Sequence, residues 1–297
     1  MTGEYGEASG RVTVHSADEY RRYASMTSAE KQEFLRLEYE QRESTDLYAT
    51  SRDYNARELE ILAIRRALRE PGAVFDLGCG NGYTLLALGA ELDERWKLIG
   101  VDFSPNLIVG ARQLLEERRD TLVSVPEFVQ ADAITYLADT PDASVDYVIT
   151  ERFVQNMPTP EVQQQVVLDI HRVLRPGGRL LMCEGSATGF DALNDIRSKL
   201  GLSVIPSTSR ENVSAIRFDD AEIERFVTEE VGFELVDKAG FSTFFLIARV
   251  LHPLLAAPDP PRFDAAINDL ARQIQERTPM TPGYGSNSLW VLEKRTA

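Results

Sequence analysis

Between residues 74 and 84 the chain reads VFDLGCGNGYT, an apolar run followed by three glycines that alternate with other residues. This order predicts a buried strand, a sharp turn and the start of a helix. Glycines at 78, 80 and 82 let the backbone approach a ligand more closely than any Cβ atom permits. Asp102 lies where the next strand should end, and a carboxylate there accepts hydrogen bonds from both hydroxyls of a ribose. The segment therefore indicates a cofactor that carries a nucleoside.

The spacing of the glycines narrows the choice of nucleoside. A dinucleotide fold needs G-x-G-x-x-G, with the pyrophosphate at the start of the helix. Here Tyr83 takes the place of the third glycine, and Asp76 at the end of the strand would repel a pyrophosphate. An acidic turn suits a cofactor that is cationic at this point and has no phosphate. S-adenosylmethionine, with its ammonium and sulfonium groups, meets both conditions.

Four later segments continue the series: Ile99–Pro105, Val129–Ala133, Asp146–Arg152 and Leu174–Leu180, the last expected as a turn before a strand. With the glycine segment they resemble, in order, the five motifs of the class I S-adenosylmethionine-dependent methyltransferases, over roughly residues 70 to 185. The resemblance implies a Rossmann-like α/β fold: a seven-stranded doubly wound sheet with N-terminal helices and C-terminal helical additions. Another Rossmann-like enzyme is the alternative.

The resemblance also implies cofactor contacts. It puts Asp102 on the ribose and Phe103 against the adenine ring, and it puts the pair Asp132 and Ala133 at the adenine amino group. Glu151 is expected to face the methionine part of the cofactor. The other expected contacts come from the first motif and from a helix before it: Arg57, Asp76, Gly78, Cys79 and Gly80. Arg57 would pair with the cofactor carboxylate, and an exposed helix arginine beside two glutamates is the alternative.

The chain is expected to divide into a preface and a larger domain. Residues 1–70 should form an N-terminal helical cap or lid, and residues 71–297 the methyltransferase domain. In the preface, Thr27 followed by Glu30 is typical of a capping box. Additions at about residues 185–219 and 242–287 extend the domain, with an exposed loop at Ser209–Val213 in the first. Leu289–Leu292 is expected to close the sheet as an antiparallel strand.

The composition restricts the partners. Forty-seven acidic residues against 32 basic ones give a net charge of −15. No basic stripe is present, so neither nucleic acid nor an anionic membrane is an expected partner. No signal peptide or membrane span is apparent, and a cytoplasmic location is expected. Cys79 and Cys183 should be small buried side chains, and no group of residues has the spacing of metal ligands.

Methyl transfer requires an acceptor atom aligned behind the methyl group, and a hydroxyl acceptor also benefits from a nearby base. Three residues are candidates for this chemistry: His252, Glu184 and Arg152. A structural role for the histidine is equally consistent with the sequence. Four residues are candidates for acceptor contacts: Gln155, Asn156, Phe245 and Tyr284. A place in the core is the alternative for the aromatic side chains.

These observations favour a methyltransferase that acts on a small-molecule acceptor, by O-methylation of a sugar or a natural-product intermediate. The chain also resembles a loosely assigned bacterial subgroup linked to sugar and secondary-metabolite pathways. The alternatives are an N- or C-methyltransferase of a small metabolite or peptide, and a non-catalytic cofactor-binding module. The sequence leaves open the acceptor, the catalytic base and the oligomeric state, for which a homodimer is one option.

Overall fold

The fold is known from a computed structural model that describes residues 22–42, 44–46, 50–51, 53–206 and 216–296. The loop expected at Ser209–Val213 lies outside the described residues. Seven strands form one sheet: β1 (Ala73–Leu77), β2 (Lys97–Asp102), β3 (Glu127–Gln130), β4 (Val145–Glu151), β5 (Leu174–Gly185), β6 (Phe233–Gly240) and β7 (Asn287–Lys294).

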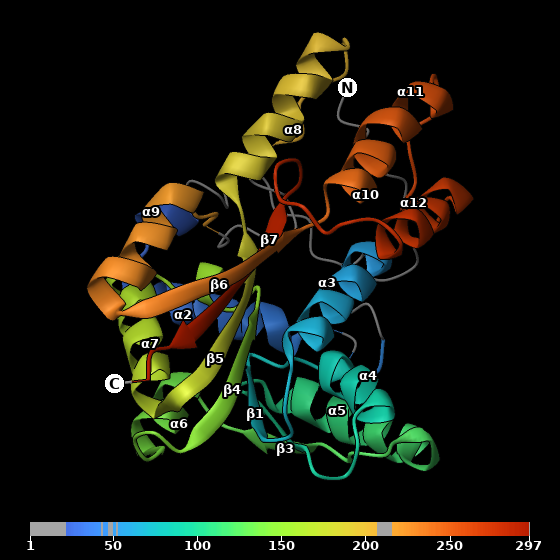
Figure 1. The fold of residues 1–297 in the computed structure, drawn as a ribbon. Coiled ribbons are helices and arrows are strands. Elements are labelled where there is room, and N and C mark those ends of the chain that lie inside the picture. Colours follow the sequence, from blue (N-terminus) through green and yellow to red (C-terminus); the bar gives the residue numbers. More distant parts are fainter. Residues whose placement is uncertain (1–21, 43, 47–49, 52, 207–215, 297) are drawn as a thin grey trace.

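The strands lie in the order β3-β2-β1-β4-β5-β7-β6 (Figure 1). The first five along the chain pair in parallel, and β7 runs antiparallel between β5 and β6. The predicted seven-stranded doubly wound sheet with an antiparallel last strand is confirmed. Because the order reverses between β1 and β4, the carboxyl ends of these two strands flank the crevice in which such sheets bind ligands.

Helices cover both faces of the sheet. One face carries α3 (Tyr54–Ala67), α4 (Tyr83–Glu91) and α5 (Pro105–Arg118). The other carries α6 (Ala133–Asp139), α7 (Pro160–Val173), α9 (Asp220–Arg225) and the π-helical turn η3 (Phe226–Val231). The remaining elements are α2 (Ser28–Glu40), the short turns η1 (Arg119–Thr121) and η2 (Val154–Asn156), α8 (Ala187–Lys199), α10 (Ser242–Leu246), the π-helical turn η4 (Ile247–Leu251), α11 (His252–Ala256) and α12 (Ala266–Glu276).

Local sequence signals set several helix starts. Thr27 and Glu30 form a complete capping box, as predicted, because each side chain accepts a hydrogen bond from the other residue's backbone N–H. Ser104 and Thr159 cap α5 and α7, and a proline follows each at the first helical position. These starts fix where the helices leave the carboxyl edge of the sheet.

The fifth motif differs from its expectation. It was expected to be a turn before the fifth strand, but β5 already begins at Leu174, which pairs with Val145. The next register pair joins Tyr147 and Arg179, so the residues between Leu174 and Arg179 bulge out of the strand. Gly177 takes a φ of 77° within this bulge. The segment expected as a turn is therefore a bulge within β5, because the pairing of Leu174 with Val145 starts the strand before it.

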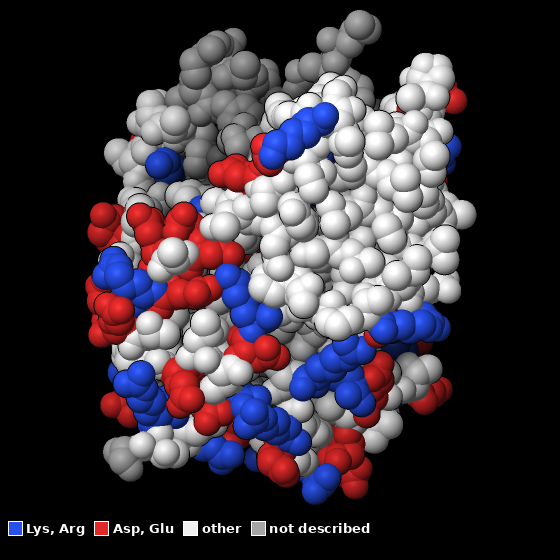
Figure 2. Space-filling view, turned by 45° about the horizontal axis from the view of Figure 1, so that its top comes forward, with Lys and Arg blue, Asp and Glu red and all other residues white. Residues whose placement is uncertain are grey.

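The helices of the second addition lie beyond one end of the sheet, at the upper right of Figure 1. There α10 packs on α12, the turn η4 contacts α10, α11 and α12, and α12 packs on α3. Figure 2 shows few charged side chains over this side of the molecule, whereas charges of both signs gather lower on the same face. Within the described residues, no helix has the length and apolar composition that a bilayer span requires.

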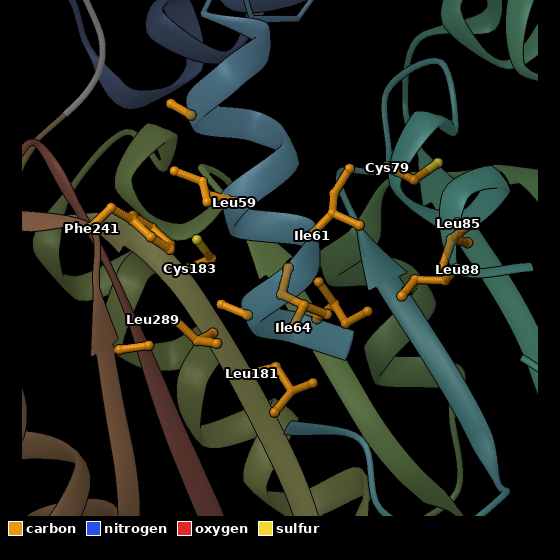
Figure 3. Packing of buried hydrophobic residues seen from close by; sticks show 14 of the residues in the cluster. Leu59, Ile61, Ile64, Cys79, Leu85, Leu88, Leu181, Cys183, Phe241 and Leu289 are labelled. Atoms are coloured by element: carbon orange, nitrogen blue, oxygen red, sulfur yellow. The ribbon is translucent and has the colours of Figure 1, made fainter. Parts of the chain in front are cut away.

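The helix α3 is held on the sheet by its apolar side. Leu59 and Ile64 are fully buried and lie over β5 and β7 (Figure 3). Cys183 of β5 belongs to the same apolar layer, as does Cys79. Both cysteines are buried and free, as predicted. This packing fixes the helix in rotation, so that its polar residues Arg57 and Glu60 are carried at the carboxyl edge of the sheet.

Candidate functional site

A cavity of about 500 Å³ lies at the carboxyl ends of β1, β2 and β4. The helix α2 and the loop that contains η2 supply the wall facing these strand ends. All ten residues expected to contact the cofactor line it: Arg57, Asp76, Gly78, Cys79, Gly80, Asp102, Phe103, Asp132, Ala133 and Glu151. The topology brings nine of them together, because they lie at or just after the ends of neighbouring strands, and α3 contributes Arg57. Their contact with the cofactor itself stays a prediction.

The glycine turn is a tight wall of this cavity. Gly78 has a φ of 73°, and a Cβ atom there would come within 2.6 Å of the Phe153 ring. The N–H groups of Gly78 and Cys79 both donate to the carbonyl of Val101, at 2.8 and 3.1 Å. The turn is thereby tied to β2, and the backbone conformation and the lack of space both call for glycine.

Asp102 ends β2 and is buried beside the turn. Its two carboxylate oxygens accept hydrogen bonds from the N–H groups of Gly80 and Ser104, each at 2.9 Å. Burial raises the pKa of Asp102, although these two bonds act in the opposite direction. A carboxylate has about four acceptor positions, so two remain for the pair of ribose hydroxyls that the sequence analysis assigns to this residue.

Asp76, near the end of β1, differs from Asp102 because it has no hydrogen-bond donor among the described residues. Its side chain is buried and accepts no hydrogen bond from any described residue. Burial, and then the charge of Glu151, raise its pKa well above the ordinary value. A buried carboxylate without a donor is costly. A cationic ligand group would remove that cost, so the ammonium of S-adenosylmethionine fits this position.

Arg57 reaches the cavity from α3. Its side chain is 3% exposed, so the alternative of an exposed helix arginine is wrong. The guanidinium stacks on the ring of Tyr83, 4.5 Å from its centroid, and Nε lies 3.9 Å from a carboxylate oxygen of Glu151. A buried guanidinium at the cavity wall suits a carboxylate ligand, since it presents paired donors.

Arg152 lines the cavity, but its guanidinium is held by protein carboxylates. It donates to Glu60, which is fully buried, and to Glu151 at 2.7 Å. Glu60 also accepts a hydrogen bond from Asn287 at 2.5 Å. The backbone of Arg152 has a φ of 54°, an uncommon conformation for a residue with a side chain, which is found most often at functional sites. Arg152 therefore neutralises two acids beside the cavity.

Glu184 does not have the position expected of a catalytic acid or base. It is fully buried, does not line the cavity, and accepts hydrogen bonds from the N–H groups of Phe153, Val154 and Gln155, at 3.0–3.2 Å. Burial raises its pKa to about 7, against the effect of these bonds. Its contacts are those of a group that shapes the η2 loop.

The expected acceptor contacts divide between two places. Asn156 lines the cavity, and its amide donates to the carbonyl of Arg152 at 2.5 Å. Gln155 is buried behind the wall, where its side-chain oxygen accepts from Gly185 N–H at 2.6 Å. Phe245 and Tyr284 do not line the cavity: Phe245 belongs to the core cluster, and Tyr284 is half-buried in the loop before β7.

His252 lies in the helical addition and is not among the residues that line the cavity. Its Nδ1 is 3.2 Å from Oδ1 of Asn268, whose amide nitrogen donates to the carbonyls of Arg262 and Phe263. The Asn268 oxygen is thus an acceptor, and Nδ1 of His252 carries the proton. Burial lowers the pKa of His252. This geometry matches the structural alternative for the histidine.

Residues 1–70 were expected to form a cap or lid, but the α2 residues that line the cavity were not singled out from the sequence: Ala29, Gln32, Glu33, Leu35, Arg36 and Tyr39. The α2 helix has no buried residue, and the ring of Tyr39 meets Phe103 edge-on, with 6.1 Å between centroids. The capping box identified the helix, but no local signal gives its position over the cavity. Glu60 was missed as a partner, although its spacing of three residues from Arg57 puts both on one side of α3.

Part of the cavity lining is apolar and includes Ala29, Leu35 and Tyr39 of α2 together with Ile134, Phe153, Met157 and Pro158. The charged pair that α2 adds to the lining, Glu33 and Arg36, is joined by hydrogen bonds at 2.6 and 2.8 Å. No described residue that lines the cavity is a histidine or a lysine. The described part of the chain also shows no group of three or more side chains arranged as metal ligands.

Comparisons with known proteins agree with this geometry. A family model described as a methyltransferase domain matches residues 75–180. An uncharacterised 37.1 kDa protein of transposon TN4556 from Streptomyces fradiae is 34% identical over 135 residues, 45% of this chain and 35% of that protein. A demethylmenaquinone methyltransferase of Shouchella clausii is 31% identical over 114 residues, 38% of this chain and 45% of that protein. The chain therefore matches less than half the length of these relatives.

Two solved structures share the fold. A methyltransferase from Methanosarcina mazei, described as S-adenosylmethionine-dependent, has a TM-score of 0.52 at 18% identity, covering 79% of this chain and 98% of that one. The cyclase SpnF has a TM-score of 0.51 at 21% identity, covering 81% of this chain and 82% of that one. At such identities the likeness concerns the fold alone, and the second example shows that this fold also serves a protein described as a cyclase.

Proposed function

We propose that the chain, whose residues 75–180 match a methyltransferase domain, is a class I S-adenosylmethionine-dependent methyltransferase that methylates a small-molecule acceptor. The observation that supports this most directly is Asp76, a buried carboxylate without a donor at the head of the glycine turn. Asp102 with free acceptor capacity, and Arg57 at the same cavity, complete a set that suits an ammonium, a ribose and a carboxylate in one ligand. S-adenosylmethionine supplies an activated methyl group when it is bound.

The charges of the cavity suit a cation. Asp76, Asp102, Glu151 and Glu60 stand against Arg57 and Arg152, which leaves an excess of carboxylates beside the space. For Glu151, burial alone would raise the pKa, but the guanidinium groups of Arg152 and Arg57 outweigh it and keep the carboxylate ionised. A site with this surplus binds a sulfonium compound better than the neutral thioether that remains after transfer.

The acceptor side favours a natural-product hydroxyl over a sugar. A sugar needs several hydrogen-bonding partners, whereas the wall made by Ile134, Phe153 and Met157 is apolar and its ion pair is internal. Without a histidine or lysine among the described lining residues, the chain's contribution is alignment and exclusion of water. We therefore propose O-methylation of a hydroxyl acidic enough to ionise near neutral pH, such as that of a phenol or an enol.

C-methylation is the second candidate. A carbon nucleophile next to such a hydroxyl needs the same ionisation and the same apolar wall. Two relatives point to it by name: an indolepyruvate C-methyltransferase from Streptomyces griseus, 29% identical over 122 residues, and a ubiquinone/menaquinone C-methyltransferase from Syntrophotalea carbinolica, 28% identical over 191 residues. N-methylation has no feature of the cavity in its favour. A non-catalytic module would bind the cofactor without transfer.

Two measurements test the proposal. Calorimetry should detect binding of S-adenosylhomocysteine, weakened roughly tenfold or more by Asp102→Ala and unchanged by Asp120→Ala in η1. Absence of binding, or equal binding by both variants, would reject the cofactor site. Transfer of labelled methyl groups to phenols of graded acidity should follow the phenolate fraction, and an alkyl glycoside should react slowly. A glycoside that reacts faster than every phenol would contradict the proposed acceptor class.

A further inference from the structure

The last turn of α2 bridges the cavity. The ring of Tyr39 meets Phe103, which follows β2, and the hydroxyl of Tyr39 lies 3.5 Å from the amide nitrogen of Asn156 in η2, which follows β4. All three residues line the cavity. Because β2 and β4 lie on opposite sides of β1 in the sheet, this turn of α2 reaches from one side of the glycine turn to the other.

Hydrophobic burial contributes little to this position of α2, since the helix has no buried residue. A polar contact from α5 holds its end instead. The side-chain nitrogen of Asn106 donates to the carbonyl oxygens of Glu40 at 3.2 Å and of Arg42 at 2.7 Å. The last carbonyls of a helix have no partner within the helix, so this one amide satisfies an acceptor that α2 leaves open and fixes the chain just beyond it.

The chain after α2 also lies close against α5 and the glycine turn. A Cβ atom at Gly110 would be 2.3 Å from the carbonyl oxygen of Ser44, and the three atoms nearest to it all belong to Ser44. Glycine weakens the interior of a helix relative to alanine, so this close approach accounts for a glycine within α5. The amide of Asn81, in the glycine turn, donates to the carbonyl of Asp46 at 2.8 Å. These contacts seat the end of α2 on elements that form the cavity.

We propose that Asn106 is a positioning residue, which holds α2 closed over the bound cofactor and thereby limits the rate of its release. The inference rests on the proposed function, because it takes the cavity to be the S-adenosylmethionine site. Asn106 follows Asp102 by four residues, so the anchor of the lid and the expected ribose contact share one short segment. A ligand beneath α2 leaves only when the helix is displaced, and its release rate then follows the population of the open state.

Two substitutions disturb this anchor and favour α5 itself. Asn106→Asp removes the donor and turns a carboxylate toward two carbonyl oxygens, while an acid in the first turn of a helix is favourable. Gly110→Ala places a methyl group against Ser44, while alanine raises helix propensity. Because they change different side chains, a folding defect in one variant leaves the other as the test. Loss of two hydrogen bonds, each worth a factor of about 2 to 10 in an equilibrium constant, should raise the open population roughly tenfold or more.

The measurement is the release of labelled S-adenosylhomocysteine from the full chain during a chase with unlabelled compound. Asn106→Asp should release it roughly tenfold faster than the wild type, and Gly110→Ala should change the rate in the same direction. Hydrogen exchange of the α2 amides, followed without ligand, should accelerate in both variants. The matched control is Asn194→Asp on α8, which should change neither rate. Asn194 is half-buried like Asn106, and its amide donates to the carbonyl of Ile205 at 2.9 Å, but it does not line the cavity.

The results separate this inference from the proposed function. Equal release rates in the wild type and in both folded variants would overturn the inference alone. Faster release with unchanged hydrogen exchange in α2 would also overturn it, because the variants would then act on the cofactor through α5 and not through the lid. A wild type that does not bind S-adenosylhomocysteine would reject the proposed function and the inference with it. Faster release together with faster exchange in α2, in variants that keep the melting temperature of the wild type, supports the proposal.

Discussion

Glu184→Gln should change how the stability of the protein depends on pH. In the folded chain burial raises the pKa of Glu184 to about 7, from 4.5 for an unperturbed glutamate. A raised folded-state pKa contributes stability that is fully present below the unfolded value and is lost as pH rises through the folded value. This group alone should therefore lower the unfolding free energy of the wild type by about 2.5 kcal/mol between pH 5 and pH 8. The glutamine variant has no such proton to lose.

Urea denaturation at pH 5 and pH 8 measures the effect, followed by the fluorescence of the buried residues Trp96 and Trp290. At pH 5 the variant resembles the protonated glutamate in shape and charge, but its amide nitrogen cannot accept the hydrogen bond that the second carboxyl oxygen takes from the backbone, so the variant should be somewhat less stable than the wild type there. At pH 8 the variant should gain about 2.5 kcal/mol relative to the wild type. Glu161→Gln is the control: hydrogen bonds lower the pKa of this exposed carboxyl, so it titrates below pH 5 and its removal should leave the stability difference between pH 5 and pH 8 unchanged. Parallel losses in wild type and Glu184→Gln would refute the reasoning.

Three further predictions concern the turn, the lid and the buried ion pairs. Gly82→Ala should lower the free energy of unfolding by about 1–3 kcal/mol more than Gly201→Ala does, as measured by urea denaturation. Both glycines have a similar positive φ, but only at Gly82 would a Cβ atom lie 2.3 Å from a ring carbon of Phe128. Equal losses of stability in the two variants would contradict this. Thr27→Ala should weaken S-adenosylhomocysteine binding a fewfold in calorimetry with little change in global stability, since α2 buries no residue; unchanged affinity would show that α2 is not a lid. Arg152→Ala should lower the free energy of unfolding by about 3–5 kcal/mol, because it leaves Glu60 buried without its cation. Adding Glu60→Gln should restore part of this stability, and losses that simply add in the double variant would exclude an energetic coupling between the two residues.

The parts of the fold that were predictable have local causes. The capping box at Thr27 forms as expected, and like the proline-started helices after Ser104 and Thr159 it depends on residues a few positions apart. The alternation of strands and helices is typical of a parallel sheet, but it does not give the order of the strands. The bulge in β5 could not be predicted, because it depends on the pairing of Leu174 with Val145, a contact between distant segments.

In the candidate site, the residues at strand ends could be predicted from the sequence, whereas those whose position depends on helix packing could not. Asp76 lies one residue before the end of β1, and Asp102 and Glu151 end β2 and β4, so the topology alone brings them to one cavity. His252 and Phe245 lie in an addition whose placement depends on helix packing, and a histidine in a sequence carries no signal of the side to which it will turn. The wall from α2 has the same limit: the sequence indicates the helix, and only tertiary structure places it over the strand ends.

The helix α3 joins these two regions physically. Its apolar side is fixed on the sheet by Leu59 and Ile64, while Arg57 and Glu60 reach the cavity and its ion pairs. Its first turn is bonded to the helical addition, which itself has no residue at the cavity. The hydrogen bonds of Tyr54 and Asn55 to α12 therefore join the addition directly to the helix that carries Arg57, and the packing of Leu59 and Ile64 fixes the rotation of that helix on the sheet.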